Sequence, residues 1–187
     1  VLAMRLLAPV PGRMVAIGGL SGTGKSTVAA AIADQVGPPP GARVLESDRI
    51  RKRLHSVRAE TRLSAQAYRP AVSARVYAAL ARDARAVLDS RHAVVVDGVF
   101  ERMACRERIE RVAREACVPF TGIWLHARAQ TLLARVDALL GDASDATAAV
   151  VRAQMAARSG PVPWVWIDAD APPGEVAAKV IRATETT

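Results

Sequence analysis

One glycine-rich segment restricts the possible folds of this chain more than any other feature. Residues 19–26 read Gly-Leu-Ser-Gly-Thr-Gly-Lys-Ser, which matches the phosphate-loop pattern G-x-x-x-x-G-K-[ST] at every position. A strand-like apolar run at residues 14–17 precedes the segment, and a helix-forming run at residues 27–33 follows it. Strand, glycine loop and helix in this order predict the phosphate-binding unit of an α/β fold.

The residue types of this loop indicate how it holds a nucleotide. Glycines let the backbone curl around phosphate, and the loop N–H groups and the helix N-terminus attract anions. We expect Lys25 to reach the β- and γ-phosphates and the Ser26 hydroxyl to bind Mg²⁺. The alternative is a Gly/Ser-rich turn that merely opens a helix. The expected nucleotide-binding residues are Gly19, Leu20, Ser21, Gly22, Thr23, Gly24, Lys25, Ser26 and Thr27.

Short apolar runs alternate with helical stretches along the rest of the chain, which is typical of α/β proteins. Such strands with helical crossovers predict a parallel sheet with helices on both faces. With 187 residues, we expect one domain over residues 1–187, with a short helical lid at about 136–158. The expected strands are 14–17, 43–46, 93–96, 120–125 and 164–167. The expected helices are 27–36, 47–54, 71–89, 103–116, 130–138, 147–158 and 174–183.

Two acids stand at the expected carboxyl ends of strands, where ligands bind in open α/β sheets. Asp97 follows the run Ala-Val-Val-Val, so we expect it to act on Mg²⁺ through a bound water. The alternative for Asp97 is a turn acid that caps the next segment. Asp48 follows the second strand and is expected to act as a general base toward a substrate hydroxyl. The alternative is that Ser47 or Asp48 caps the next helix. Arg51, one turn along that helix, is expected to face the same substrate.

Composition sets limits on location and partners. The formal net charge is +8, and nucleic acid, anionic substrates or an Arg- and Ala-rich background would each explain it. The arginines are scattered and aromatic residues are few, so nucleic acid is the less favoured partner. No apolar run is long enough to cross a bilayer, and Cys105 and Cys117 are expected to be reduced, so we expect a cytoplasmic protein without membrane contact. Since the first residue is Val and not Met, we expect either that the chain is the C-terminal piece of a longer protein or that its start is missing from the numbering.

Several motifs together resemble one known group of kinases. The phosphate loop with the later run Ser-Asp-Arg-Ile-Arg-Lys-Arg-Leu at 47–54 is similar to zeta toxins, chloramphenicol phosphotransferase, gluconate kinase and 5′-hydroxyl polynucleotide kinases. A narrower resemblance adds Val-Asp-Gly-Val-Phe at 96–100 and Gly-Asp-Ala-Ser-Asp-Ala at 141–146. All four segments resemble the ATP-binding, kinase-like half of bacterial two-part proteins, in which an aminoglycoside-phosphotransferase-like domain precedes this one.

This resemblance implies a nucleoside-monophosphate-kinase-like fold with strand order 2-3-1-4-5 and ATP with Mg²⁺ as the phosphoryl donor. That order would place Asp97 near the Mg²⁺ and Asp48 further out, beside the acceptor. It also implies lid arginines that stabilise the transferred phosphoryl group. Arg135 matches one of them, whereas Leu139 and Leu140 stand where a second is expected, and Arg152 is the candidate substitute.

The leading hypothesis is an ATP-dependent kinase that transfers the γ-phosphoryl group to a hydroxyl of a small molecule. Its expected catalytic residues are Lys25, Asp48, Arg51 and Arg135, with Ser26 and Asp97 at the metal. One alternative is a 5′-hydroxyl polynucleotide kinase. A second is a non-catalytic ATP-binding module that regulates a fused or associated phosphotransferase-like domain. The sequence does not identify the acceptor or the oligomeric state.

Overall fold

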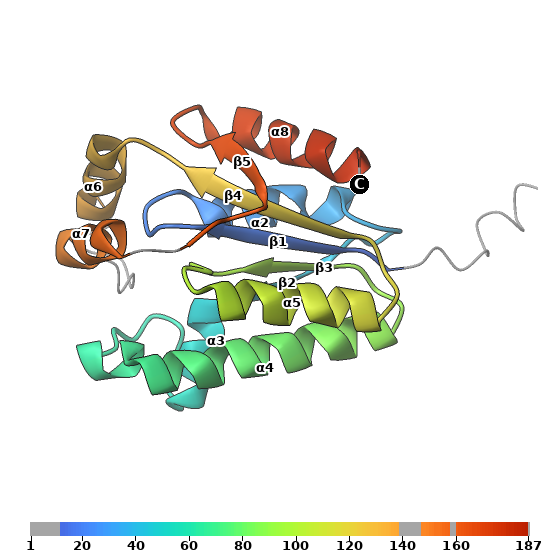
Figure 1. The fold of residues 1–187 in the computed structure, drawn as a ribbon, viewed down its shortest axis with the longest axis horizontal. Helices are drawn as coiled ribbons and strands as arrows, with labels where there is room; N and C mark the ends of the chain where they lie inside the picture. The colour runs from blue at the N-terminus through green and yellow to red at the C-terminus, as the bar shows by residue number, and fades with distance from the viewer. Residues whose placement is uncertain (1–11, 139–146, 158–159, 187) are drawn as a thin grey trace, which may run out of the picture.

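The computed structural model describes residues 12–138, 147–157 and 160–186. Its centre is a parallel sheet with the strand order β2-β3-β1-β4-β5, as the resemblance implied (Figure 1). The strands are β1 (Met14–Gly19), β2 (Arg43–Glu46), β3 (Val94–Asp97), β4 (Phe120–His126) and β5 (Val165–Asp168). Each strand expected from the sequence is present, with its ends shifted by two residues at most.

Helices cover both faces of the sheet (Figure 1). In chain order the α-helices are α2 (Lys25–Ile32), α3 (Ser47–Leu54), α4 (Pro70–Asp89), α5 (Met103–Glu115), α6 (Ala129–Ala138), α7 (Ala148–Ala156) and α8 (Pro173–Glu185). Two short 3₁₀ helices, Ala33–Gln35 and Ala65–Tyr68, complete the described elements. The motif at 141–146, together with Leu139 and Leu140, lies outside the described residues.

The three central strands β1, β3 and β4 are buried on both faces, and their alternate side chains enter two separate cores. Met14 and Ala16 pack with α4 and α5 on one side, whereas Val15 and Ile17 pack with α2 and α8 on the other. The valines of β3 divide in the same way, because successive side chains of a strand point to opposite faces. This explains why the strands read as unbroken apolar runs instead of alternating with polar residues.

All five strands end at the same edge of the sheet, and the helices α6 and α7 lie beyond that edge (Figure 1). Leu132 and Val136 of α6 pack on Val151 of α7, and Leu20 of the phosphate loop packs against this small cluster. Thr147 caps α7 by accepting a hydrogen bond from the Val150 N–H at 3.3 Å. The carboxyl edge is therefore bordered by the loop, by α3 and by the α6–α7 pair.

Within the part of the chain that the structure describes, no helix combines the length and the hydropathy needed to cross a membrane.

Candidate active site

The phosphate loop connects β1 to α2 and has the backbone that its glycines predict. Gly22 and Gly24 have φ values of 85° and 83°, in the left-handed region that other residues adopt only at a cost. A Cβ atom on Gly22 would also lie 2.8 Å from the carbonyl oxygen of Leu132 in α6. Gly22 is therefore required both for the turn and for the close approach of α6, and Gly24 leads directly into α2.

Lys25 is the first residue of α2, and its side chain contacts the phosphate loop. Its Nζ donates to the carbonyl oxygen of Leu20 at 2.9 Å, and the hydroxyl of Thr23 donates to the same oxygen at 2.8 Å. Burial lowers the pKa of Lys25, and the nearby charge of Asp97 partly opposes this effect. A phosphate group would supply the negative charge that this desolvated ammonium group favours.

Asp97 ends β3 opposite Ile17 of β1, where the sequence predicted a carboxylate. It is 4% exposed, and its Oδ2 atom has no hydrogen-bond partner within the described residues. Burial raises the pKa of Asp97, whereas the Lys25 charge and a hydrogen bond with Ser26 lower it. A buried polar atom without a partner is costly, so this arrangement is suited to a ligand that is not part of the chain.

The oxygens of Ser26 and Asp97 fit Mg²⁺, which is commonly held by one or two protein oxygens together with substrate phosphates and waters. No group of three or more His, Cys, Asp or Glu side chains capable of holding a metal occurs in the described ranges. The described side chains therefore do not form a complete metal site by themselves. Ser26 and Asp97 instead match a metal that arrives with a nucleotide.

Asp48 lies on α3, just after β2, with its side chain half exposed. Its Oδ1 accepts a hydrogen bond from the Tyr68 hydroxyl at 3.3 Å, and its Oδ2 lies 3.4 Å from the ammonium nitrogen of Lys52. The capping position of α3 is Glu46, and no side chain caps the helix. The alternative in which Ser47 or Asp48 serves as the N-cap is therefore wrong, and the Asp48 carboxylate contacts Tyr68 and Lys52 instead.

Arg51 lines the same cavity as Asp48, but its guanidinium is mostly occupied by the protein. It is 7% exposed, donates from Nη1 to the carbonyl oxygen of Ala67 at 2.7 Å, and lies over the Tyr68 ring, 4.5 Å from its centroid. Lys52 similarly donates to the carbonyl oxygen of Ala59. These contacts anchor residues 56–69 onto α3, so Arg51 shapes this wall of the cavity.

Arg135 reaches the phosphate loop from α6. Its Nη1 lies 3.5 Å from the carbonyl oxygen of Gly22, a long hydrogen bond, and its side chain lines the cavity. Arg152, the candidate substitute for the second lid arginine, is exposed on α7 and is not among the described residues that line the cavity.

One cavity of about 1370 Å³ joins these groups along the carboxyl edge of the sheet. The phosphate loop, Asp97, Asp48, Arg51 and Arg135 all line it. The wall beyond Asp48 is formed by Tyr68, Tyr77, Arg102, Cys105 and Arg108, whereas Ala169, Ala171, Pro173 and Val176 line the end near β5. The cavity exceeds a typical single-ligand pocket of about 300–1,000 Å³, so it has room for two ligands side by side.

Sequence reasoning missed several residues of this wall. Tyr77 accepts a hydrogen bond from the Phe100 N–H at 2.9 Å through its hydroxyl, which fixes the loop after Asp97. Burial raises the pKa of the Tyr77 hydroxyl, so it stays protonated. Gln154 of α7 contacts Ser21 of the phosphate loop. A single Tyr or Gln on a helix carries no signal of such contacts, because the partners are 23 and 133 residues away in the sequence.

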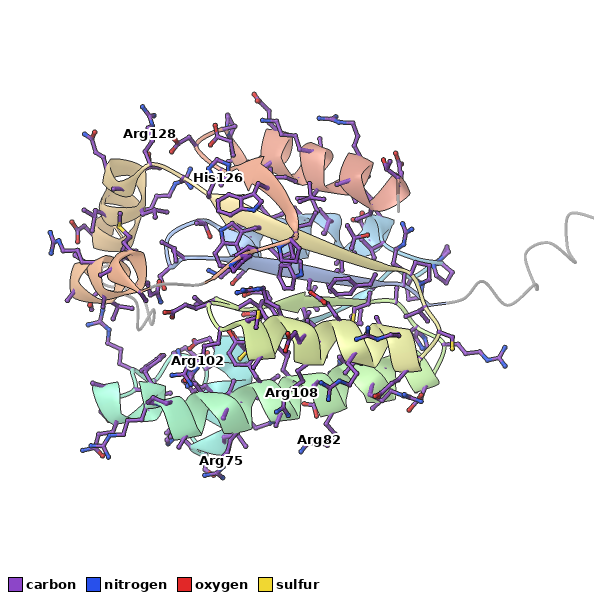
Figure 2. All side chains as sticks on the ribbon, viewed as in Figure 1. Arg75, Arg82, Arg102, Arg108, His126 and Arg128 are labelled. Atoms are coloured by element: carbon purple, nitrogen blue, oxygen red, sulfur yellow. The ribbon has the colours of Figure 1, made fainter. Side chains whose placement is uncertain are left out.

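Arg102 is the N-cap of α5 and Arg108 lies in its second turn, and both side chains extend on the side of α4 (Figure 2). Cys105 lies three residues before Arg108, so these two positions are neighbours on the helix surface. Neither arginine forms an ion pair with an acid among the described residues. The acceptor end of the cavity therefore presents two guanidinium groups that form no ion pair with any acid in the described part of the chain.

Cys105 provides a chemical probe of this wall. Burial raises the pKa of its thiol, although the Arg102 and Arg108 charges oppose this effect, whereas Cys117 is exposed. Since the thiolate is the reactive form, N-ethylmaleimide at pH 7.5 is expected to modify Cys117 about tenfold faster than Cys105. Peptide mass spectrometry of a time course measures both rates. Equal rates would contradict the raised pKa of the half-buried Cys105 thiol.

Comparisons with known proteins agree with this geometry. The fold is that of P-loop kinases, and the chain belongs to the AAA_33 family, described as an AAA domain, which it matches over residues 14–161. A relative, the uncharacterized protein Rv2004c of Mycobacterium tuberculosis, is 33% identical over 165 residues. The match covers 84% of this chain and 32% of the relative, so the chain spans about a third of that protein.

Two solved kinase structures are similar in fold. A gluconokinase from Sinorhizobium meliloti 1021 has a TM-score of 0.62 and 23% identity, covering 94% of this chain and 93% of its own. The Mycobacterium tuberculosis APS kinase CysC, in complex with AMPPNP and APS, has a TM-score of 0.67 and 22% identity, covering 94% and 98%. The similarity supports a kinase-like fold and leaves the acceptor open.

Proposed function

We propose that this chain is an ATP-dependent kinase that transfers the γ-phosphoryl group to a hydroxyl of a small molecule. The observation that carries the proposal is the single cavity in which the phosphate loop, the buried Asp97 and the half-exposed Asp48 meet. A donor site and an acceptor site in one cavity are what direct phosphoryl transfer requires, since the reacting oxygen must lie in line with the γ-phosphorus.

Lys25 and the loop N–H groups bind the phosphates of ATP in this proposal, and Ser26 and Asp97 hold Mg²⁺. The metal supplies positive charge that neutralises the phosphates. Asp48 accepts the proton of the acceptor hydroxyl. The oxygen of that hydroxyl bonds to the γ-phosphorus as the bond from the γ-phosphorus to ADP breaks and ADP leaves. The base of ATP lies near residues 168–172, a location supported by the apolar lining that Ala169, Ala171 and Val176 provide at that end.

The end of α6 and all of α7 belong to a lid, residues 136–158, that closes over the phosphates. Arg135 stabilises the transferred phosphoryl group from this side, and Arg51 steadies the acceptor by holding its wall in place. Residues 1–187 form one domain in this proposal, and its partner is a fused or associated phosphotransferase-like domain. The 32% share of the relative's length that the chain spans is consistent with such an arrangement.

The charge of the acceptor wall favours particular acceptors. Arg102 and Arg108 would bind an acid group on a small molecule, since guanidinium groups pair well with carboxylates and phosphates. The same two residues are the observation that favours the second candidate, a kinase for 5′-hydroxyl oligonucleotides, whose backbone phosphates they would contact.

An acceptor screen tests the proposal. The protein is incubated with ATP and Mg²⁺ and with separate pools of sugars, sugar acids, aminoglycosides, nucleosides and 5′-hydroxyl oligonucleotides, and mass spectrometry detects products heavier by one phosphoryl group. A product from a small-molecule pool is the expected result. A product from the oligonucleotide pool alone favours the second candidate. ATP binding without any phosphorylated product would instead favour a regulatory ATP-binding module over a kinase.

A further inference from the structure

Gln154 on α7 makes two hydrogen bonds to one residue of the phosphate loop. Its Oε1 accepts from the Ser21 N–H at 2.9 Å, and its Nε2 donates to the Ser21 Oγ at 3.1 Å. The carboxamide thus binds the backbone and the side chain of Ser21 at once, across 133 residues of sequence. Both residues line the main cavity.

The chemistry of this pair determines what Ser21 does with its own proton. A hydroxyl has one donor and two acceptor lone pairs, and Gln154 occupies a lone pair by donating to it. The Ser21 O–H therefore remains free to donate elsewhere. A carboxamide can make both contacts because it carries a donor and an acceptor on neighbouring atoms, which neither a carboxylate nor an ammonium group does.

The contact lies within a continuous junction between the phosphate loop and the α6–α7 pair. Three consecutive loop residues take part in it. Leu20 packs on the cluster that α6 and α7 share, Ser21 binds Gln154 of α7, and the Gly22 carbonyl oxygen faces Arg135 of α6. Movement of α7 away from the loop must break the Gln154–Ser21 bonds, so the position of the helix and the orientation of Ser21 change together.

We propose that Gln154 is a positioning residue that directs the Ser21 hydroxyl toward the terminal phosphate of a bound nucleoside triphosphate and so couples α7 to that phosphate. This inference rests on the proposed binding of ATP and does not require phosphoryl transfer. In this proposal the neutral carboxamide of Gln154 links α7 to the phosphate loop. Arg152 on the same helix does not line the cavity.

The proposal predicts a selective loss of affinity for triphosphates. ADP lacks the phosphate that Ser21 would contact, so Gln154→Leu is expected to leave the Kd for ADP within about twofold of the wild type. The Kd for AMPPNP, a non-hydrolysable ATP analogue, is expected to rise about tenfold to a hundredfold, the loss expected for one hydrogen bond to a charged group. Gln154→Glu is expected to weaken AMPPNP binding further, because its carboxylate would accept a hydrogen bond from the Ser21 O–H and would repel the phosphate.

Isothermal titration with ADP and AMPPNP, each with Mg²⁺, measures the ratio of the two Kd values in every variant. Gln130→Leu is the matched control, because it makes the same chemical change at an exposed position on α6. Gln130 is not among the described residues that line the cavity. Ser21→Ala and the double variant Ser21→Ala/Gln154→Leu complete a cycle. If Gln154 acts through Ser21, the double variant loses no more AMPPNP affinity than Ser21→Ala alone.

Three results together would support the proposal. The ratio of the AMPPNP and ADP Kd values changes in Gln154→Leu, it stays unchanged in Gln130→Leu, and the effects of Ser21→Ala and Gln154→Leu are not additive. An unchanged ratio, or equal weakening of both nucleotides, would overturn it, because Gln154 would then have no role directed at the terminal phosphate. Additive effects would overturn the route through Ser21. A wild-type protein that binds neither nucleotide would overturn the proposed function as well, so the two failures are distinguishable.

Discussion

Asp48→Asn is expected to lower kcat for phosphoryl transfer by about 10²–10⁴-fold, the usual contribution of a general base, with the Kd for ATP nearly unchanged. Asn has the shape of Asp and still accepts the hydrogen bond that Tyr68 donates at 3.3 Å, but it cannot take a proton from the acceptor. Asp48 lies on α3 rather than in the phosphate loop, so nucleotide binding does not depend on its charge.

The matched control is Asp34→Asn, which makes the same change at an exposed position in the 3₁₀ helix Ala33–Gln35. Steady-state kinetics with the acceptor found by the screen, together with ATP titration, measure both parameters. A kcat within about threefold of the wild type would contradict the assignment of Asp48 as the general base. A large loss of ATP affinity would show instead that the substitution disturbs the loop.

The second large effect concerns stability. Arg106→Met is expected to lower the free energy of unfolding by about 3–4 kcal/mol, which lowers Tm by about 10 °C in a chain of this length. Arg106 is 1% exposed within α5. Its guanidinium donates to the carbonyl oxygens of Phe100, Glu101 and Pro161 at 2.7–2.8 Å. Methionine fills the space but leaves these buried acceptors without donors, which is the costly outcome.

Arg111→Met on the same helix is the control, because Arg111 is exposed, and its Tm is expected to change by less than about 2 °C. Thermal unfolding followed by circular dichroism compares the two variants. Similar Tm values for Arg106→Met and the wild type would contradict the role assigned to Arg106, which is to join α5 to the loop after Asp97 and to the segment before β5.

The sheet could be predicted from the sequence because its signals are local. Each buried strand is a short apolar run, and the phosphate loop identifies the first strand and the first helix after it. The position of Asp97 was predictable for the same reason, since an acid directly after a buried strand must lie at the carboxyl edge. The order of the strands came from the resemblance of the motifs, and the structure confirms it.

Tertiary contacts account for what the sequence did not reveal. Arg106 is one of the scattered arginines to which sequence reasoning assigned no role, and Arg51 was expected to face the substrate. Both are buried and bind backbone carbonyl groups. Gln154 meets Ser21 only because α7 folds back over the phosphate loop. Such partners are set by the packing of whole elements, so no spacing within a single helix indicates them.

The most direct test of the kinase proposal follows the γ-phosphoryl group itself. ATP labelled at the γ-phosphate is incubated with Mg²⁺, the acceptor from the screen, and the wild type, Asp48→Asn or Lys25→Ala. The proposal predicts label in the acceptor hydroxyl with the wild type, almost none with Asp48→Asn although ATP is bound, and none with Lys25→Ala, which fails to hold the phosphates. Label transfer that survives in Asp48→Asn, or tight ATP binding by the wild type with no label in any acceptor, would contradict it.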